Sequence, residues 1–158
     1  MTILISDANI LIDVVEGRIV DPFFQLPFVI CVPDLLFVDE LADFHSDLPE
    51  KGLVLKELEP NSLEKAMHLQ QRYKKSSRYD CLALALAVQE DCPLLTGDQD
   101  LRDAGVQENI DVHGTLWLVD IMIEKEVITL NTAYEAYKLM YASGRRLPWK
   151  QVWKRFKT

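Results

Sequence analysis

The feature of this sequence that most restricts its fold is a set of short, mainly apolar segments separated by stretches with helical spacing. These segments lie at residues 2–6, 28–32, 93–96 and 110–113, and each has the length of a buried strand. A strand that is apolar on both faces belongs in a parallel sheet that helices cover on either side. Asn-Gly hairpin signals are absent from the sequence. The sequence therefore predicts an α/β fold with a small parallel sheet between helices.

Apolar residues three and four positions apart predict the helices between and after these strands. Asn61-Ser-Leu-Glu64 has the pattern of a capping box, and Ser77-Arg-Tyr-Asp80 has a weaker form of it. Gly105 is the expected end of one short helix. The predicted helices cover residues 8–15, 34–45, 61–74, 99–104, 115–125, 132–142 and 149–156, with a further apolar helix that opens at Ser77.

The composition limits the class of protein. With 158 residues, 49% apolar and 27% charged, the chain is expected to form a single globular domain over residues 1–158, with a core at about 2–113 and a helical extension at about 114–158. No apolar run approaches the roughly 20 residues of a membrane span, and the first residues do not read as a secretory signal. The three cysteines are scattered without a CxxC pair, which indicates a reduced, cytoplasmic protein.

Carboxylates follow the predicted strands at the points where parallel strands end. Asp7 comes directly after the first strand, and Asp98 follows the strand at 93–96. Both are expected at the carboxyl edge of the sheet, where ligands of such folds bind. Glu40 lies about two turns into the helix after the second strand, and Asp80 lies in the first turn of its helix. Four carboxylates from distant parts of the sequence are thus candidates for one site.

Each of these acids also has a purely structural interpretation, which the sequence leaves open. Asp7 fits the N-cap of the first helix, and Asp80 fits the acidic partner in a capping box with Ser77. Asp98 or Asp100 fits the cap of the short helix before Gly105. Glu40 fits a solvated helix position beside other acids.

Clustered carboxylates repel and raise each other's pKa, so a convergent set favours a bound cation. Hard oxygen ligands without histidine or thiolate partners point to Mg²⁺ or Mn²⁺ rather than zinc. His45, His68 and His113 show no HxxxH-type spacing, which also argues against a zinc site. A site of this kind activates water and stabilises the oxygens of a phosphodiester.

These residues together resemble the PIN domain family. The resemblance rests on the apolar strand into Asp7-Ala-Asn9, on Val32-Pro33 followed by Glu40-Leu41, on Asp80 before an alanine-rich helix, and on Leu94-Leu-Thr96-Gly-Asp98. It implies a metal-dependent nuclease that hydrolyses RNA, and many members are the toxins of toxin–antitoxin pairs of the VapC type. The resemblance also assigns roles to individual residues: Asp7, Glu40, Asp80 and Asp98 as catalytic residues and ligands of Mg²⁺ or Mn²⁺, with Asn9, Thr96 and Asp100 as supporting residues.

The expected partners are RNA, an antitoxin protein and a second copy of the chain in a homodimer. The chain carries a net charge of −8, but the last 16 residues hold six bases and no acids. Candidate RNA contacts near Asp80 and in this basic tail are Lys74, Lys75, Arg78, Arg145 and Arg146. The aromatic stripe of the tail is expected to dock on the core, while its bases either guide RNA or only solvate a helix face.

Two other functions compete with the nuclease hypothesis. A non-catalytic PIN-like module would bind nucleic acid or protein, although the intact acid set argues against it. A phosphatase of the haloacid dehalogenase type also places an acid after its first strand, but it needs a second aspartate two residues later as general acid. This chain has Asn9 at that position, and an amide does not deliver a proton.

Overall fold

A five-stranded parallel sheet forms the centre of the molecule, and the computed structural model describes residues 1–157. The strand order is β3-β2-β1-β4-β5, and every neighbouring pair runs parallel. The predicted α/β fold with a small parallel sheet is therefore confirmed. The strands are β1 (Thr2–Ser6), β2 (Phe28–Pro33), β3 (Val54–Lys56), β4 (Leu94–Leu95) and β5 (Val112–His113).

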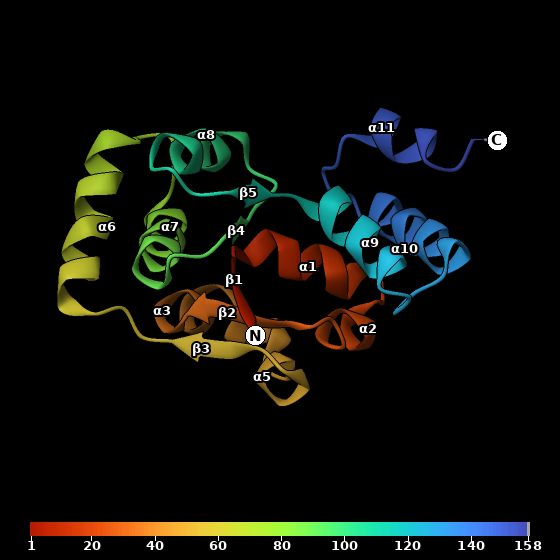
Figure 1. Ribbon diagram of the computed structural model, residues 1–158, viewed down its shortest axis with the longest axis horizontal. Helices are drawn as coiled ribbons and strands as arrows, with labels where there is room; N and C mark the ends of the chain where they lie inside the picture. The colour runs from red at the N-terminus through yellow and green to blue at the C-terminus, as the bar shows by residue number, and fades with distance from the viewer. Residues whose placement is uncertain (158) are drawn as a thin grey trace.

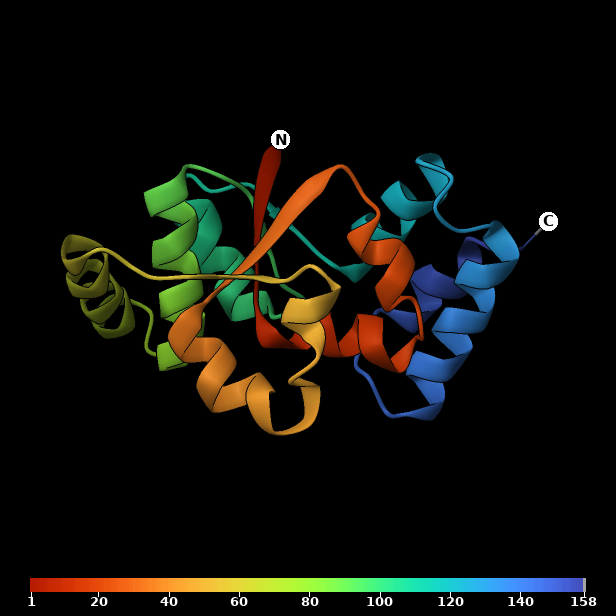
Figure 2. The same ribbon diagram turned by 90° about the horizontal axis from the view of Figure 1, so that it is seen from below.

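Helices cover both faces of this sheet, as the predicted order of elements requires. Helices α6 and α7 lie on one side, and α1, α9 and α10 lie on the other (Figures 1 and 2). The helical elements before β4 are α1 (Ala8–Glu16), α2 (Val20–Phe24), α3 (Asp34–Leu36), η1 (Phe37–Leu41), α4 (Ala42–His45), α5 (Leu48–Lys51), α6 (Pro60–Arg72) and α7 (Arg78–Glu90). Those after it are α8 (Gln99–Gln107), α9 (Thr115–Glu124), α10 (Leu130–Ala142) and α11 (Trp149–Lys154).

The core lies between β1 and the helices that sandwich it. Ile5 of β1 pairs with Cys31 of β2 and Leu94 of β4, and all three are buried. On α7, every residue from Cys81 to Ala87 is buried, because this helix packs on the sheet and also carries α6 and α8 on its outer sides. A helix that is apolar all round belongs in such an enclosed position.

The two predicted capping boxes have different outcomes. The box at Ser77 is confirmed, because the Asp80 N–H donates to the Ser77 hydroxyl and the Ser77 N–H donates to the Asp80 carboxylate, each at 3.1 Å. The box at Asn61 is wrong. Helix α6 begins at Pro60, with Glu59 as an N-cap that makes no side-chain bond. Proline has a preset φ and no N–H to satisfy, so it takes the first helical position.

The predicted end of a helix at Gly105 is also wrong, since α8 continues to Gln107. A Cβ at Gly105 would lie 2.6 Å from the Cγ2 of Val112 on β5. The glycine therefore allows α8 to approach the sheet edge and does not stop the helix. Strand β3 was not predicted from the sequence, because its Val54 and Leu55 are exposed at the edge of the sheet and give no buried apolar signal.

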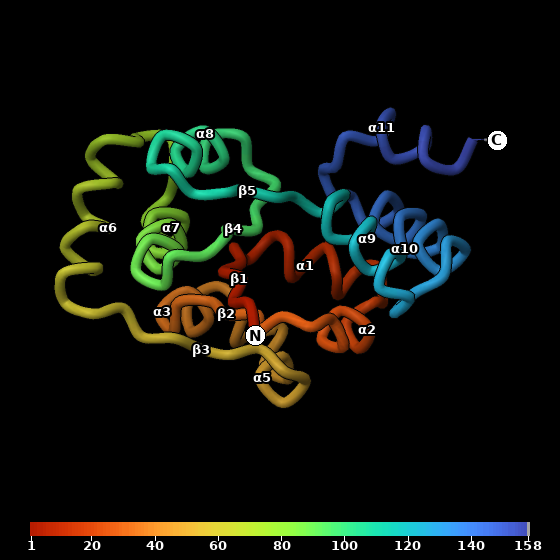
Figure 3. The backbone as a smooth tube through the Cα atoms, in the orientation of Figure 1, coloured from red at the N-terminus to blue at the C-terminus, as the bar shows by residue number. Residues whose placement is uncertain are grey.

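The chain after β5 forms a helical group beside α1. Helices α9 and α10 pack there, and the following segment turns back toward α8 and β5 before it enters α11 (Figure 3). Val152 is fully buried, while Trp149 stacks on Trp153 and meets Tyr137 edge-on. The expected docking of the aromatic stripe is therefore confirmed. Within residues 1–157, no helix has both the length and the apolar character that a membrane crossing requires.

Candidate active site

Asp7 stands at the carboxyl end of the central strand, where only 2% of its surface is exposed. Its N–H donates to the Leu95 carbonyl of β4 at 3.0 Å, which extends the sheet pairing beyond β1. One carboxylate oxygen accepts from the Ile10 N–H at 2.9 Å, so Asp7 is the N-cap of α1. The other oxygen accepts from the Thr96 hydroxyl. Asp7 therefore caps α1, as its structural interpretation expects, and also stands at the carboxyl edge of the sheet, as the site hypothesis expects.

The Asp7 carboxyl is held in an environment that disfavours its charge. Burial raises its pKa from 3.8 to about 7, against the hydrogen bonds from Thr96 and Ile10, and the nearby charge of Asp80 adds to the rise. None of the ion pairs formed within residues 1–157 includes Asp7. A buried carboxylate without a cation is costly, so this position favours an added positive charge.

Asp80 occupies the first turn of α7, and its cap bond to Ser77 fixes the side chain there. Burial raises its pKa, and the charge of Asp98 raises it further, while the hydrogen bonds with Ser77 oppose the change. Asp80 also raises the pKa of Asp7 and of Glu40. It is therefore the carboxylate through which the other three are electrostatically linked.

Glu40 reaches this region from a helix that changes its winding. The predicted helix at 34–45 contains a π-helical turn, η1, in which the Ala42 N–H donates to the carbonyl of Phe37 five residues earlier. Such turns are rare and occur often at functional sites. The Tyr79 hydroxyl donates to Asp39 and so connects η1 to the start of α7. The Glu40 side chain itself is exposed, and its pKa is raised by partial burial and by the charges of Asp80 and Asp39.

Asp98 is the exposed N-cap of α8, where it accepts from the Leu101 N–H at 2.9 Å. Its own N–H donates to the Thr96 hydroxyl at 3.1 Å. The fully buried Thr96 therefore contacts two of the candidate acids, because its hydroxyl donates to Asp7 and accepts from Asp98. The supporting role expected for Thr96 has a physical basis in these two bonds. Asp100 is exposed in the first turn of α8.

The donor chemistry of these acids fits a hard divalent cation. The set contains only carboxylate oxygens, and three of its four members have a raised pKa. Within the described chain, no three His, Cys, Asp or Glu side chains meet in a ready-made ligand group. Mg²⁺ does not require such a group, because it keeps several waters and commonly takes only one or two protein carboxylates. Asp7 together with Asp80 is sufficient for that arrangement.

The predicted basic residues have different environments. Lys74 and Lys75 are exposed in the turn after α6, and Arg78 lies at the start of α7 with its guanidinium over the ring of Tyr79. Arg146 is exposed, whereas Arg145 is partly buried and forms an ion pair with Asp13.

Arg145 belongs to a partly buried network that was not predicted from the sequence. Its Nε donates to Asp13 at 2.6 Å, and Thr115 donates to the other Asp13 oxygen at 2.7 Å. The Nη2 of Arg145 donates to the side-chain oxygen of Asn9 at 3.1 Å. Asn9 thus bonds to Arg145, while its expected support of Asp7 has no direct bond among the contacts described. The signal in the sequence was Asp13, an acid inside the otherwise apolar run Ile10–Val15.

The comparisons with known proteins agree with this architecture. The model of the family DUF3368, described as a PIN domain, matches residues 3–157. The match continues through the C-terminal helices, beyond the residues on which the resemblance in the sequence was based. No curated protein shows significant similarity to the chain. Since the family match spans nearly the whole sequence, the chain belongs to the PIN domain family.

Proposed function

We propose that this protein is a metal-dependent endoribonuclease that hydrolyses phosphodiester bonds of RNA. The observation that carries the proposal is Asp7, a carboxylate that is buried at the tip of the central strand without a cationic partner and beside Asp80. A buried carboxylate with a structural role has a cationic partner in this protein. Asp13, for example, is buried against the guanidinium of Arg145. The absence of such a partner at Asp7 is what a site for a bound cation requires.

Asp7 and Asp80 would hold Mg²⁺ or Mn²⁺ at this edge of the sheet, with Glu40 and Asp98 as further candidate ligands. The bound ion would supply Lewis-acid stabilisation of the phosphodiester and lower the pKa of a water molecule. The contribution of the protein to catalysis would be to hold its carboxylates in fixed positions around the ion. Thr96 fixes Asp7 and the backbone of Asp98, and Ser77 fixes Asp80, so these acids are oriented before RNA binds.

The cleavage assay that tests this proposal uses end-labelled single-stranded RNA of mixed sequence, with Mn²⁺, with Mg²⁺ or with EDTA. We expect internal cleavage with either metal and none in EDTA. DNA of the same sequence in a parallel reaction decides between a ribonuclease and a general nuclease. Cleavage that persists in EDTA, or no cleavage of RNA with either metal, would contradict the proposal.

Metal binding is also expected to stabilise the fold, since the ion binds only the folded state. At a Mn²⁺ concentration about 100 times its dissociation constant, the free energy of unfolding rises by about 3 kcal/mol. For a domain of this size, that corresponds to a melting temperature about 5–10 °C higher. Thermal unfolding during a Mn²⁺ titration measures the shift. Asp103→Asn removes an exposed carboxylate of α8 and should keep the full shift, whereas an unchanged melting temperature in the native chain counts against the site.

A role as the toxin of a toxin–antitoxin pair is the finer form of this proposal, with a protein antitoxin and a homodimer as expected partners. It predicts that induced expression of the native chain arrests growth of a bacterial host. The same expression of an Asp7→Asn variant should not. A non-catalytic role in binding nucleic acid or protein is the alternative, and it would leave the two strains alike.

A further inference from the structure

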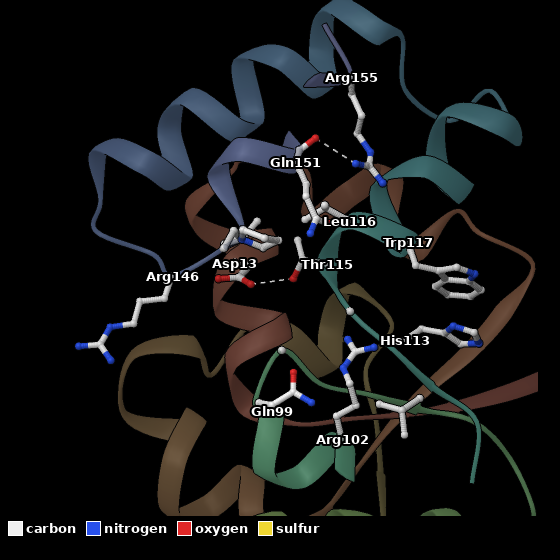
Figure 4. Close-up of a pocket in the computed structure, with 15 residues that line it drawn as sticks. Asp13, Gln99, Arg102, His113, Thr115, Leu116, Trp117, Arg146, Gln151 and Arg155 are labelled. Atoms are coloured by element: carbon white, nitrogen blue, oxygen red, sulfur yellow. Dashed lines mark hydrogen bonds between the residues drawn. The ribbon is translucent and has the colours of Figure 1, made fainter. Parts of the chain in front are cut away.

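A cavity of about 610 Å³ adjoins the carboxylate site and has no role in the function proposed so far. It lies where the carboxyl ends of β4 and β5 meet the segment that leads into α11 (Figure 4). Gly97 lines it, directly between Thr96 and Asp98 of the candidate active site. A molecule in this cavity would therefore be a neighbour of a substrate at the carboxylates. Its volume is in the range of small-molecule sites.

The cavity contains a cation that is free to bind a ligand. Arg102 of α8 makes no ion pair or side-chain hydrogen bond within residues 1–157, and its guanidinium points toward Gly114 at the start of α9 (Figure 4). The other lining arginines differ. Arg155 is held by Asp120 through two bonds of 3.0 and 2.9 Å, and Arg146 extends away from the other labelled side chains. Arg102 is thus the cation that can meet an anionic group inside the cavity.

A stacked aromatic pair lines the same cavity as Arg102. The ring of His113 stacks on Trp117 with centroids 4.0 Å apart and an angle of 12° between the planes (Figure 4). Both residues line the cavity, and both are partly exposed. Stacked aromatic faces of this kind receive nucleobases in proteins that bind single-stranded RNA. The cavity therefore combines a recognition element for a phosphate with one for a base.

We propose that this cavity binds one nucleotide of an RNA strand, next to the phosphodiester at the carboxylates. Arg102 contacts the phosphate, and the His113–Trp117 pair stacks with the base. The inference rests on the proposed function for its choice of RNA as ligand. It assigns the C-terminal helices a part in substrate binding, since residues 146–155 close one side of the cavity.

The test measures binding of a fluorescein-labelled single-stranded RNA by fluorescence anisotropy, in EDTA and over a series of salt concentrations. Arg102→Gln should weaken binding about tenfold and make the slope of log affinity against log salt shallower by about 0.7, the value for one phosphate contact on a single strand. Lys125→Gln makes the same charge change on an exposed residue at the end of α9 and should bind like the native chain. Trp117→Leu keeps an apolar side chain, removes the stack and should also weaken binding.

The cavity proposal is overturned if Arg102→Gln binds RNA like Lys125→Gln, or if the native chain does not bind RNA. It is also overturned if adenosine monophosphate binds with the same dependence on Arg102 and RNA does not, because the ligand is then a free nucleotide. If Trp117→Leu does not fold, Arg102→Gln still decides the question. Because binding is measured without metal, a loss of affinity in Arg102→Gln supports the cavity even if the native chain shows no cleavage with Mn²⁺.

Discussion

Replacing Asp7 with asparagine is expected to reduce Mn²⁺-dependent RNA cleavage at least about 100-fold, without unfolding the protein. The amide has nearly the same shape, but it lacks the charge that would hold a metal ion at the tip of β1. A metal contributes several kcal/mol to the transition state, and each 1.4 kcal/mol changes the rate tenfold. Initial cleavage rates of the two purified proteins measure the effect.

The same substitution is expected to stabilise the metal-free protein at neutral and alkaline pH. The folded-state pKa of Asp7 is about 7, against 3.8 for an unperturbed aspartate. Between these values the folded state holds a proton that the unfolded state has lost, so the native protein loses stability as pH rises through this window. The full cost is about 4 kcal/mol above pH 7. Asparagine avoids most of that cost but does not reproduce every hydrogen bond, so we expect a gain of about 1–2 kcal/mol at pH 8.

Denaturant unfolding in EDTA at pH 5 and pH 8 measures this difference. The free energy of unfolding of Asp7→Asn should exceed that of the native chain by more at pH 8 than at pH 5. Asp103→Asn serves as the control and should show native cleavage and native stability at both values. Native cleavage by Asp7→Asn would remove Asp7 from the mechanism. Lower stability of that variant at pH 8 would show that Asp7 is a structural cap alone.

Replacing Arg145 with alanine is expected to destabilise the protein by about 3 kcal/mol. The change leaves Asp13 buried with only the Thr115 hydroxyl as a partner. Burial raises the pKa of Asp13, and Arg145 is the main group that opposes this. Removing one member of a buried pair is more harmful than removing both, because a charge is left without compensation. The melting temperature should fall by about 6–12 °C.

The neighbouring Arg146→Ala is the matched control, since Arg146 is exposed and its substitution should leave the melting temperature unchanged. The double variant Asp13→Asn with Arg145→Ala should recover part of the lost stability. An Arg145→Ala protein as stable as the native chain would show that Asp13 is satisfied by other groups. Additive effects of the two changes would show that the pair is not coupled.

The parts of the fold that depend on local sequence were predictable. The apolar runs of β1 and β2 and the cap residues Ser77 and Asp80 carry their signals within a few positions. Asp7 and Asp98 were assigned to one edge of the sheet because a parallel sheet brings the carboxyl ends of its strands together. The π-helical turn that contains Glu40 and the exposed strand β3 had no local signal, since each depends on packing against distant segments.

The connections over long distances in the chain could not be predicted from one sequence. The bond from Thr96 to Asp7 joins residues 89 positions apart, and the bond from Arg145 to Asp13 spans 132 positions. Arg145 was a candidate RNA contact because it lies in a basic tail on an acidic chain, where the alternative was a solvated helix face. Pairing with a buried acid became visible only when α1 and the end of α10 were placed side by side. The cavity beside Arg102 has the same origin, because it is formed by segments that the sequence does not connect.

The partner of Asp13 also sets an order of events during synthesis on the ribosome. Helix α1 leaves the ribosome early, but Arg145 follows only 132 residues after Asp13. Until then Asp13 of the nascent protein lacks the guanidinium of Arg145, and α1 lacks the ion pair that joins it to the segment after α10. A chain that ends before Arg145, through premature termination or proteolysis, retains that unpaired acid and is a poor candidate for stable folding. The molecule thus links the anchoring of α1 to the synthesis of the segment that follows α10.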